Sequence, residues 1–149
     1  MSAQLAIQTA IVTALMAAPA VAGGNVKANV VRPFSAGQSL ACVVRLVQSR
    51  APTPQVLGGF YTWDTRFDVE CMARGANGAA DPVAAVDALL ELVWQRLSTL
   101  PTTGLGVVDV RMQPSIDWQV DEIDLPVASA TVSLFVNHRT ASTTLTAAP

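Results

Sequence analysis

Side chains suited to catalysis are few in this sequence, and His138 is its one histidine. A zinc site with two histidine ligands is therefore excluded. His138 could act as a general base only if a serine or cysteine from elsewhere in the chain met it in space. Because it stands near the end of an alternating segment, we interpret it as a hydrogen-bonded or solvated residue at a strand end.

Two groups of acidic residues have side chains that could bind a cation or transfer protons. Asp68 and Glu70 share one face of a predicted strand, and Asp121, Glu122 and Asp124 crowd a predicted hairpin tip. Neither group has the spacing or the glycine of an EF-hand loop. We interpret both groups as solvated surface charge.

The short motifs of cofactor and hydrolase chemistry are missing. Gly104-Leu105-Gly106 faintly resembles a dinucleotide loop, but it follows a predicted helix and precedes a strand, which is the reverse of the order that binds pyrophosphate. The sequence has no GxxxxGK(S/T), GxSxG or HExxH motif. We expect no catalytic residue, no metal and no cofactor.

Cys42 and Cys71 do not form a CxxC motif, and both lie in apolar alternating segments. This setting favours buried free thiols and is compatible with a reducing compartment. A disulfide stays open as an alternative if the two strands are neighbours.

The composition indicates a surface that other protein partly covers. The length of 149 residues favours one compact domain. Hydrophobic residues make up 51% of the chain, with 24 alanines and 20 valines, and charged residues make up 13%. An ordinary soluble domain has about 25% charged residues. Few charges are thus available to solvate the surface of a monomer.

The charges are also unevenly distributed along the chain. Residues 1–63 carry four basic residues, among them the single lysine Lys27, and no acid, whereas residues 64–149 carry five arginines and all eleven acids. The net charge of −2 and the lack of any basic run exclude the usual footprint of a nucleic-acid-binding protein. The asymmetry could set the direction in which copies stack, with chance placement in loops as the alternative.

The first 22 residues could be mistaken for a secretory signal. They contain no lysine or arginine, and Gln4, Gln8, Thr9 and Thr13 form a polar stripe at helical spacing. Ser2 can cap a helix, and Pro19 with the following glycine pair can end it. We therefore predict an amphipathic helix over residues 3–18 and no membrane span.

The remaining chain predicts five strands and a second helix. The strands are expected at Val26–Val31, Leu40–Gln48, Phe60–Arg74, Val107–Val120 (broken near Gln113-Pro114) and Ala128–Arg139. The helix begins at Pro82 after the N-cap Asp81 and stops before Pro101. This order, α-β-β-β-α-β-β, predicts a two-layer α+β fold with a mostly antiparallel sheet. Residues 1–139 form one domain in this prediction, and residues 140–149 a loose tail.

The ordered set of these segments resembles tail terminator (tail completion) proteins of long-tailed bacteriophages, of the minor tail protein U type. The resemblance covers most of the chain, and its segments are AAPAVAGG, NVVRPFSAG, LACVVRLVQ, WDTRFDVECMARG, DPVAAVDALLELVWQRL, SIDWQV and ATVSLFVNHRT. Its most telling part is a long charged strand that leads into a helix opened by Asp-Pro.

The resemblance implies a virion protein that acts by binding and is not an enzyme. Such proteins form a ring, typically of six copies, at the head-proximal end of the tail. The ring binds the last tail-tube ring, stops polymerisation and presents a surface to the head–tail connector. Assembly takes place in the host cytoplasm, and DNA is met only as it passes through the lumen. An acidic lining there would limit adhesion of phosphate, with Asp117, Asp121, Glu122 and Asp124 as candidates.

Tyr61, Trp63 and Trp118 are candidate interface anchors, with core packing as the alternative for the two tryptophans. We expect contact surfaces on loop 50–63 and on tip 118–125. The predicted interface residues are Arg50, Tyr61, Trp63, Arg66, Trp118, Asp121, Glu122 and Asp124. Two other functions stay open, namely another neck or head–tail connector component and a small enzyme that uses His138.

Overall fold

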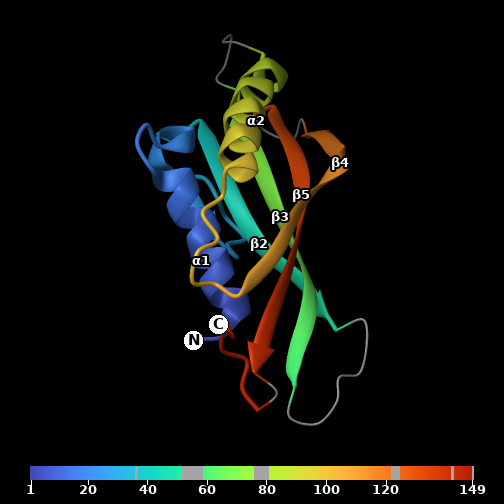
Figure 1. The fold of residues 1–149 in the computed structure, drawn as a ribbon. Coiled ribbons are helices and arrows are strands. Elements are labelled where there is room, and N and C mark those ends of the chain that lie inside the picture. Colours follow the sequence, from blue (N-terminus) through green and yellow to red (C-terminus); the bar gives the residue numbers. More distant parts are fainter. Residues whose placement is uncertain (36, 52–58, 76–80, 122–124, 142, 149) are drawn as a thin grey trace.

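The computed structural model describes residues 1–35, 37–51, 59–75, 81–121, 125–141 and 143–148. It has two helices and a five-stranded sheet (Figure 1). In chain order the elements are α1 (Ala3–Met16), η1 (Val21–Gly24), β1 (Val26–Ala28), β2 (Leu40–Arg50), β3 (Phe60–Arg74), α2 (Pro82–Ser98), β4 (Val107–Asp121) and β5 (Val127–Ala141). The two-layer, mostly antiparallel α+β fold is confirmed.

The strands lie side by side in the order β1-β2-β3-β5-β4, so β1 and β4 are the edge strands. The pair β1–β2 is parallel and the other three pairs are antiparallel. We call the end of the sheet where β4 finishes and β5 begins the Asp121 end, and the end where β3 begins the Phe60 end. β1 is paired with Cys42–Val44 and therefore lies nearer the Asp121 end.

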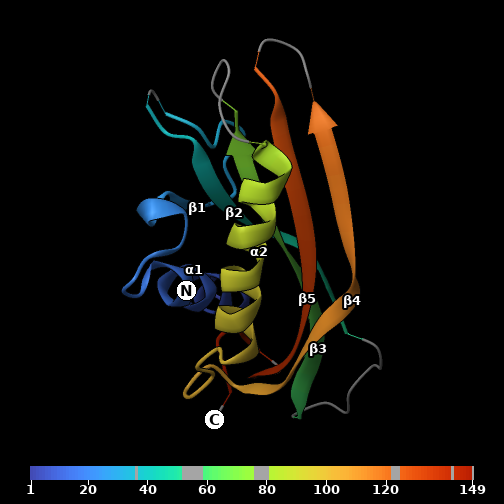
Figure 2. The same ribbon diagram turned by 90° about the horizontal axis from the view of Figure 1, so that it is seen from above.

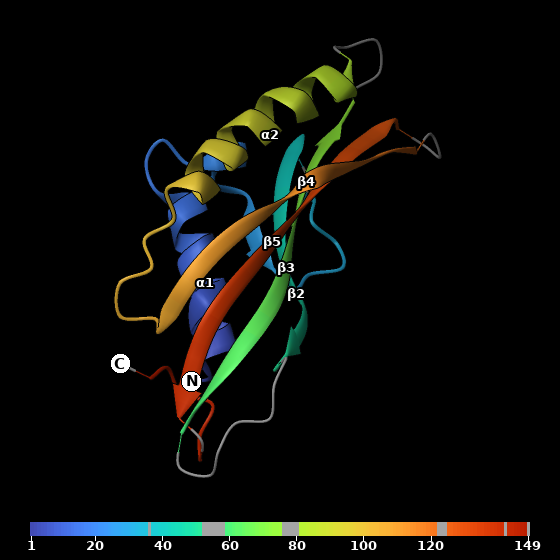
Figure 3. The same ribbon diagram turned by 45° about the vertical axis from the view of Figure 1, so that its right-hand side comes forward.

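Both helices cover the same face of the sheet, which we call the helix-side face (Figures 2 and 3). α1 packs mainly on β1 and β2, and α2 on β3 and β5. One apolar core joins the helices to alternate residues of the strands, such as Ile11 and Val93 from the helices and Val44, Phe67 and Val132 from the sheet. The period of two along each strand directs these residues to one side.

The structure changes the interpretation of the polar stripe on α1. Gln4 and Gln8 are buried rather than solvated, and the side chain of Gln8 bonds both Asn29 and the carbonyl of Val44 at 3.0 Å. The hydroxyls of Thr9 and Thr13 donate hydrogen bonds to backbone carbonyls one turn earlier in the helix. Gln8 therefore anchors α1 to the sheet edge through hydrogen bonds, whereas the side-chain oxygen of Gln4 has no partner among the described residues.

α2 begins as its sequence predicts. The Asp81 carboxylate accepts a hydrogen bond from the backbone N–H of Val83 at 2.9 Å, and Pro82 occupies the first turn. The buried stripe of the helix consists of Val86, Leu89, Leu90, Val93 and Leu97. Val83, in the first turn, is exposed.

The bounds of β1, β2, β4 and β5 differ from prediction, in β4 by the single residue Asp121. β1 ends at Ala28 instead of Val31 because Asn29 has a positive φ of 52° and its side chain caps Leu46. β2 and β5 extend two residues further at their C-terminal ends because both stay paired with β3. The predicted break in β4 is a register shift between Met112 and Ile116, where Pro114 lacks the N–H needed for pairing.

Residues 143–148 fold back onto the domain, which differs from the loose tail that we predict. Thr140 pairs with Ala147, and the N–H of Ala3 bonds the carbonyl of Leu145 at 2.7 Å. Ala148 is buried beside the turn at Gly106. The small side chains that suggested a loose end are what allow this close backbone packing.

Within the described residues, neither helix is both long and apolar enough to cross a membrane.

Candidate functional site

His138 is buried and does not face solvent. Its Nε2 lies 2.9 Å from the hydroxyl of Thr65, which in turn lies 2.9 Å from the hydroxyl of Ser49. Its Nδ1 has no partner among the described residues. A histidine and a hydroxyl within bonding distance have the composition of a base and nucleophile pair, but both residues are 0% exposed, and a substrate therefore has no access to them in this conformation.

Burial lowers the pKa of His138 because the charged ring would leave water and its Nδ1–H would lack an acceptor. The unfolded chain, with a histidine pKa of about 6.5, then binds the proton more readily than the folded one. We expect the free energy of unfolding to be highest above that pH and to fall below it, by at most about 1.4 kcal/mol per pH unit. Urea midpoints measured between about pH 8 and about pH 5 test this, because His138→Gln should flatten the slope. Equal slopes in both proteins would contradict it.

Cys42 and Cys71 are directly opposite each other on the neighbouring strands β2 and β3. Both are buried and both are free thiols, as the sequence favours, so the disulfide alternative is not found here. The hydrogen bond to Cys42, and then burial, raise the pKa of Cys71 well above its usual value. The Cys71 thiol is therefore protonated and poorly reactive, and both cysteines belong to the core.

Two carboxylates on the face away from the helices, which we call the outer face, are held in ion pairs with arginines of neighbouring positions. Glu70 meets Arg45 at 2.8 Å, and Asp68 binds the guanidinium of Arg66 through both oxygens at 2.8 and 3.1 Å. The hydroxyl of Ser133 also donates to Asp68. Asp68 and Glu70 are thus paired rather than merely solvated. No group of three potential metal ligands occurs among the described residues.

The predicted interface residues fall at opposite ends of the sheet. Arg50, Tyr61 and Trp63 lie at the Phe60 end, and Trp118 and Asp121 lie on β4 at the Asp121 end. Arg66 stands between them on the outer face, engaged with Asp68. Glu122 and Asp124 lie outside the described residues. The structure therefore presents two separate surfaces.

The two tryptophans have different environments. Trp63 is half-buried, its indole N–H donates to the hydroxyl of Thr140 at 2.9 Å, and its ring centroid is 6.2 Å from that of Tyr61. Trp118 is 43% exposed. Trp63 thus serves the packing of its own chain, whereas Trp118 has the exposure that a contact with another chain requires.

Trp118 belongs to an exposed apolar row that we did not identify from the sequence. Ile116 and Val120 flank it on β4 and are 37% and 52% exposed. All three are paired with the core residues Val132, Ala130 and Ala128 of β5, so they lie on the helix-side face. Alternating apolar residues were visible in the sequence, but they indicate a buried strand as readily as an uncovered one.

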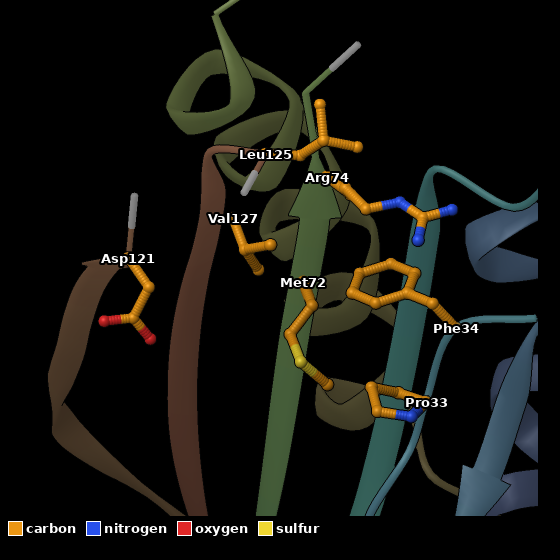
Figure 4. A pocket seen from close by; sticks show the side chains of 7 residues that line it. All are labelled: Pro33, Phe34, Met72, Arg74, Asp121, Leu125 and Val127. Atoms are coloured by element: carbon orange, nitrogen blue, oxygen red, sulfur yellow. The ribbon is translucent and has the colours of Figure 1, made fainter. Parts of the chain in front are cut away.

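A hollow lies on the outer face at the Asp121 end of the sheet (Figure 4). It measures about 660 Å³. The guanidinium of Arg74 stands 5.2 Å from the centre of the Phe34 ring and donates to the carbonyl of Gln38, and Asp121 stands across the hollow. The remaining lining residues are Pro33, Met72, Leu125 and Val127. The described part of this lining is mostly apolar and holds neither a histidine nor a hydroxyl or thiol, so it suits an apolar side chain.

Gly104 and Gly106 belong to the turn between α2 and β4, with positive φ at both, so they serve the chain reversal. The described surfaces offer apolar and charged contacts, and the hydrogen-bonded histidine is enclosed. Comparison of the chain with protein-family models finds no match, and comparison with curated proteins finds none either.

Proposed function

We propose that this protein is a structural virion protein that closes the end of a bacteriophage tail tube as a ring. In this role it binds the last ring of tube subunits, ends polymerisation and forms the joining surface for the head–tail connector. It acts by binding, with no bond made or broken. It is assembled in the host cytoplasm and resides at the head-proximal end of the tail. Six copies are the number that the resemblance implies.

The observation that carries the proposal is the open edge strand β4 with its uncovered apolar row. Ile116, Trp118 and Val120 form an exposed apolar row on this edge strand, and an exposed edge strand can pair with a strand of another chain. A subunit that works only by contact with other subunits has a use for this surface. The element order α-β-β-β-α-β-β and the Asp-Pro start of α2 agree with the resemblance to tail terminators.

Another neck or head–tail connector component would use the same kind of surface, and it is the second candidate. The two functions differ in what happens when the protein is missing. Without a terminator, nothing stops the tube from growing. Without a connector component on the head side, tails grow to their normal length but stay detached from heads.

Electron microscopy of particles from a phage whose copy of this gene is interrupted separates these outcomes. We expect tails of uncontrolled length, and restoration of one length when the intact gene is supplied on a plasmid. Normal tails without heads would replace the proposal with the connector function. Normal infectious particles would overturn both. Supplying His138→Gln as a third arm tests the enzyme alternative, because binding by an intact fold should still restore length.

A further inference from the structure

The sheet has two open edges with opposite charge. At one edge, β1 carries Lys27 and no acid. At the other edge, β4 carries Asp109, Asp117 and Asp121. Of the four ion pairs found among the described residues, none includes Lys27 or Asp117. The Lys27 ammonium instead donates to the carbonyl of Pro33 at 3.2 Å, and on β4 neither Asp117 nor Asp121 belongs to one of these pairs.

Lys27 and Asp117 lie at the same level across the sheet. Following the register strand by strand gives three rows, namely Val26, Cys42, Cys71, Ala130 and Trp118; Lys27, Val43, Glu70, Thr131 and Asp117; and Ala28, Val44, Val69, Val132 and Ile116. Directly paired residues share a face. Lys27 and Asp117 therefore both lie on the outer face, and Val26 and Ala28 share the helix-side face with Trp118 and Ile116.

The backbone of β1 also has groups that point to the free edge of the sheet, away from β2. The carbonyl of Asn25 accepts from the N–H of Cys42, and the N–H of Asn29 donates to the carbonyl of Val44. Since backbone groups alternate in direction along a strand, those of Val26 and Ala28 point away from β2. Their outward groups can pair with a further strand.

The directions of β1 and β4 are also suited to pairing between two copies. β1 is parallel to β2, and each later step across the sheet, to β3, β5 and β4, is antiparallel. β4 therefore runs opposite to β1. If a second copy continues the sheet beyond β4, its β1 meets β4 in antiparallel orientation, with the apolar rows on one face and Lys27 opposite Asp117 on the other. In this register Val26 of the second copy lies opposite Trp118, and its Ala28 lies opposite Ile116.

We propose that copies of this chain join head to tail by pairing β1 of one copy with the Ile116–Trp118 stretch of β4 in the next, with Lys27 opposite Asp117. Such a heterologous contact uses two different edges, so each copy keeps one edge free for the following copy until a closed ring is complete. The inference rests on the proposed function for the closure into a ring, whereas the contact itself follows from the register, charge and exposure of this chain.

Disulfide cross-linking tests the contact. The test uses a variant with both Lys27→Cys and Asp117→Cys, as purified protein and in assembled particles. Both preparations are oxidised with copper phenanthroline. The remaining thiols are then blocked before the protein is denatured. Directly opposed residues of antiparallel strands lie close enough for a disulfide. We expect a ladder of covalent multimers on a non-reducing gel. The matched control joins Lys27→Cys with Asp109→Cys, which places the same thiol on β4 at the Phe60 end.

The outcomes separate this contact from the proposed function. No ladder in either preparation, or an equal ladder with Asp109→Cys, overturns the edge contact whatever the tail-length experiment shows. A ladder specific to Asp117→Cys supports the contact, even if loss of the protein leaves tail length unchanged and so overturns the terminator function.

Charge reversal provides a second test that needs no thiol. Asp117→Lys alone and Lys27→Asp alone place like charges opposite each other and should each abolish assembly in sedimentation and particle yield. The double variant restores the opposite pair and should recover assembly. Failure of the double variant to recover, with its fold intact by circular dichroism, overturns the pairing.

Discussion

Replacing Trp118 with aspartate is expected to lower the yield of infectious particles by at least about 30-fold while leaving the fold intact. The indole is 43% exposed in the middle of the apolar row on β4. An aromatic anchor at the centre of a contact contributes about 2 kcal/mol or more, which is about 30-fold in affinity. In a ring of identical copies, every contact between subunits loses this same binding free energy. Since the residue is outside the core, the free energy of unfolding should change by about 0.5 kcal/mol or less.

Val108→Asp is the matched control for this variant. Val108 is 55% exposed on the same strand, but it lies at the Phe60 end, away from the row that faces β1 in the proposed contact. Particle titre and unfolding followed by circular dichroism are measured for both variants, because removal of Trp118 changes the fluorescence. An equal loss of titre in the two variants would remove the special role of Trp118.

Gly106→Ala is expected to destabilise the protein by about 3 kcal/mol. Gly106 has φ +64°, which costs a residue with a side chain about 1–2 kcal/mol. A Cβ there would also stand 2.8 Å from the carbonyl oxygen of Ala148 and 2.9 Å from that of Arg139. Both atoms are backbone, so relief requires the end of β5 and the returning chain to separate. The hydrogen bond from Ala148 N–H to the Arg139 carbonyl would then be lost.

Gly104→Ala separates the cost of the positive φ from the cost of the close backbone contacts. Gly104 has a similar φ of +78°, but nothing lies within 4 Å of the position a Cβ would take. It should cost only the backbone term of about 1–2 kcal/mol. Urea unfolding measured by tryptophan fluorescence gives both values. If the two variants were equally stable, close packing of the returning chain against Gly106 would be contradicted.

Much of the fold could be predicted from local patterns. The bounds of β3 were predicted to the residue, because fifteen alternating residues end at a glycine. The start of α2 was predicted because Asp81 and Pro82 act within one turn. The cysteines were predicted to be buried because both stand in apolar runs. Each of these features depends on neighbours along the chain.

The candidate site could be predicted only in part. The residue type of Trp118 marks it as an interface candidate, but nothing marks its neighbours Ile116 and Val120, because apolar alternation indicates a preference for burial and not whether a helix covers the strand. Lys27 was noted as the single lysine, yet nothing local placed it level with Asp117. His138 was expected at a strand end, and it is enclosed because β4 and the returning chain close around the end of β5.

By itself the sequence determined the types of elements, their approximate bounds, the shortage of charge and the separation of bases from acids along the chain. Hydrogen-bonding and apolar preferences that act over a few residues are sufficient for these. The tertiary structure alone decided that β5 enters between β3 and β4, which makes β4 an edge and sets Lys27 and Asp117 on opposite sides of one sheet. Strand order is determined by pairing between segments far apart in the chain, and local periodicity carries no information about which partner a strand takes.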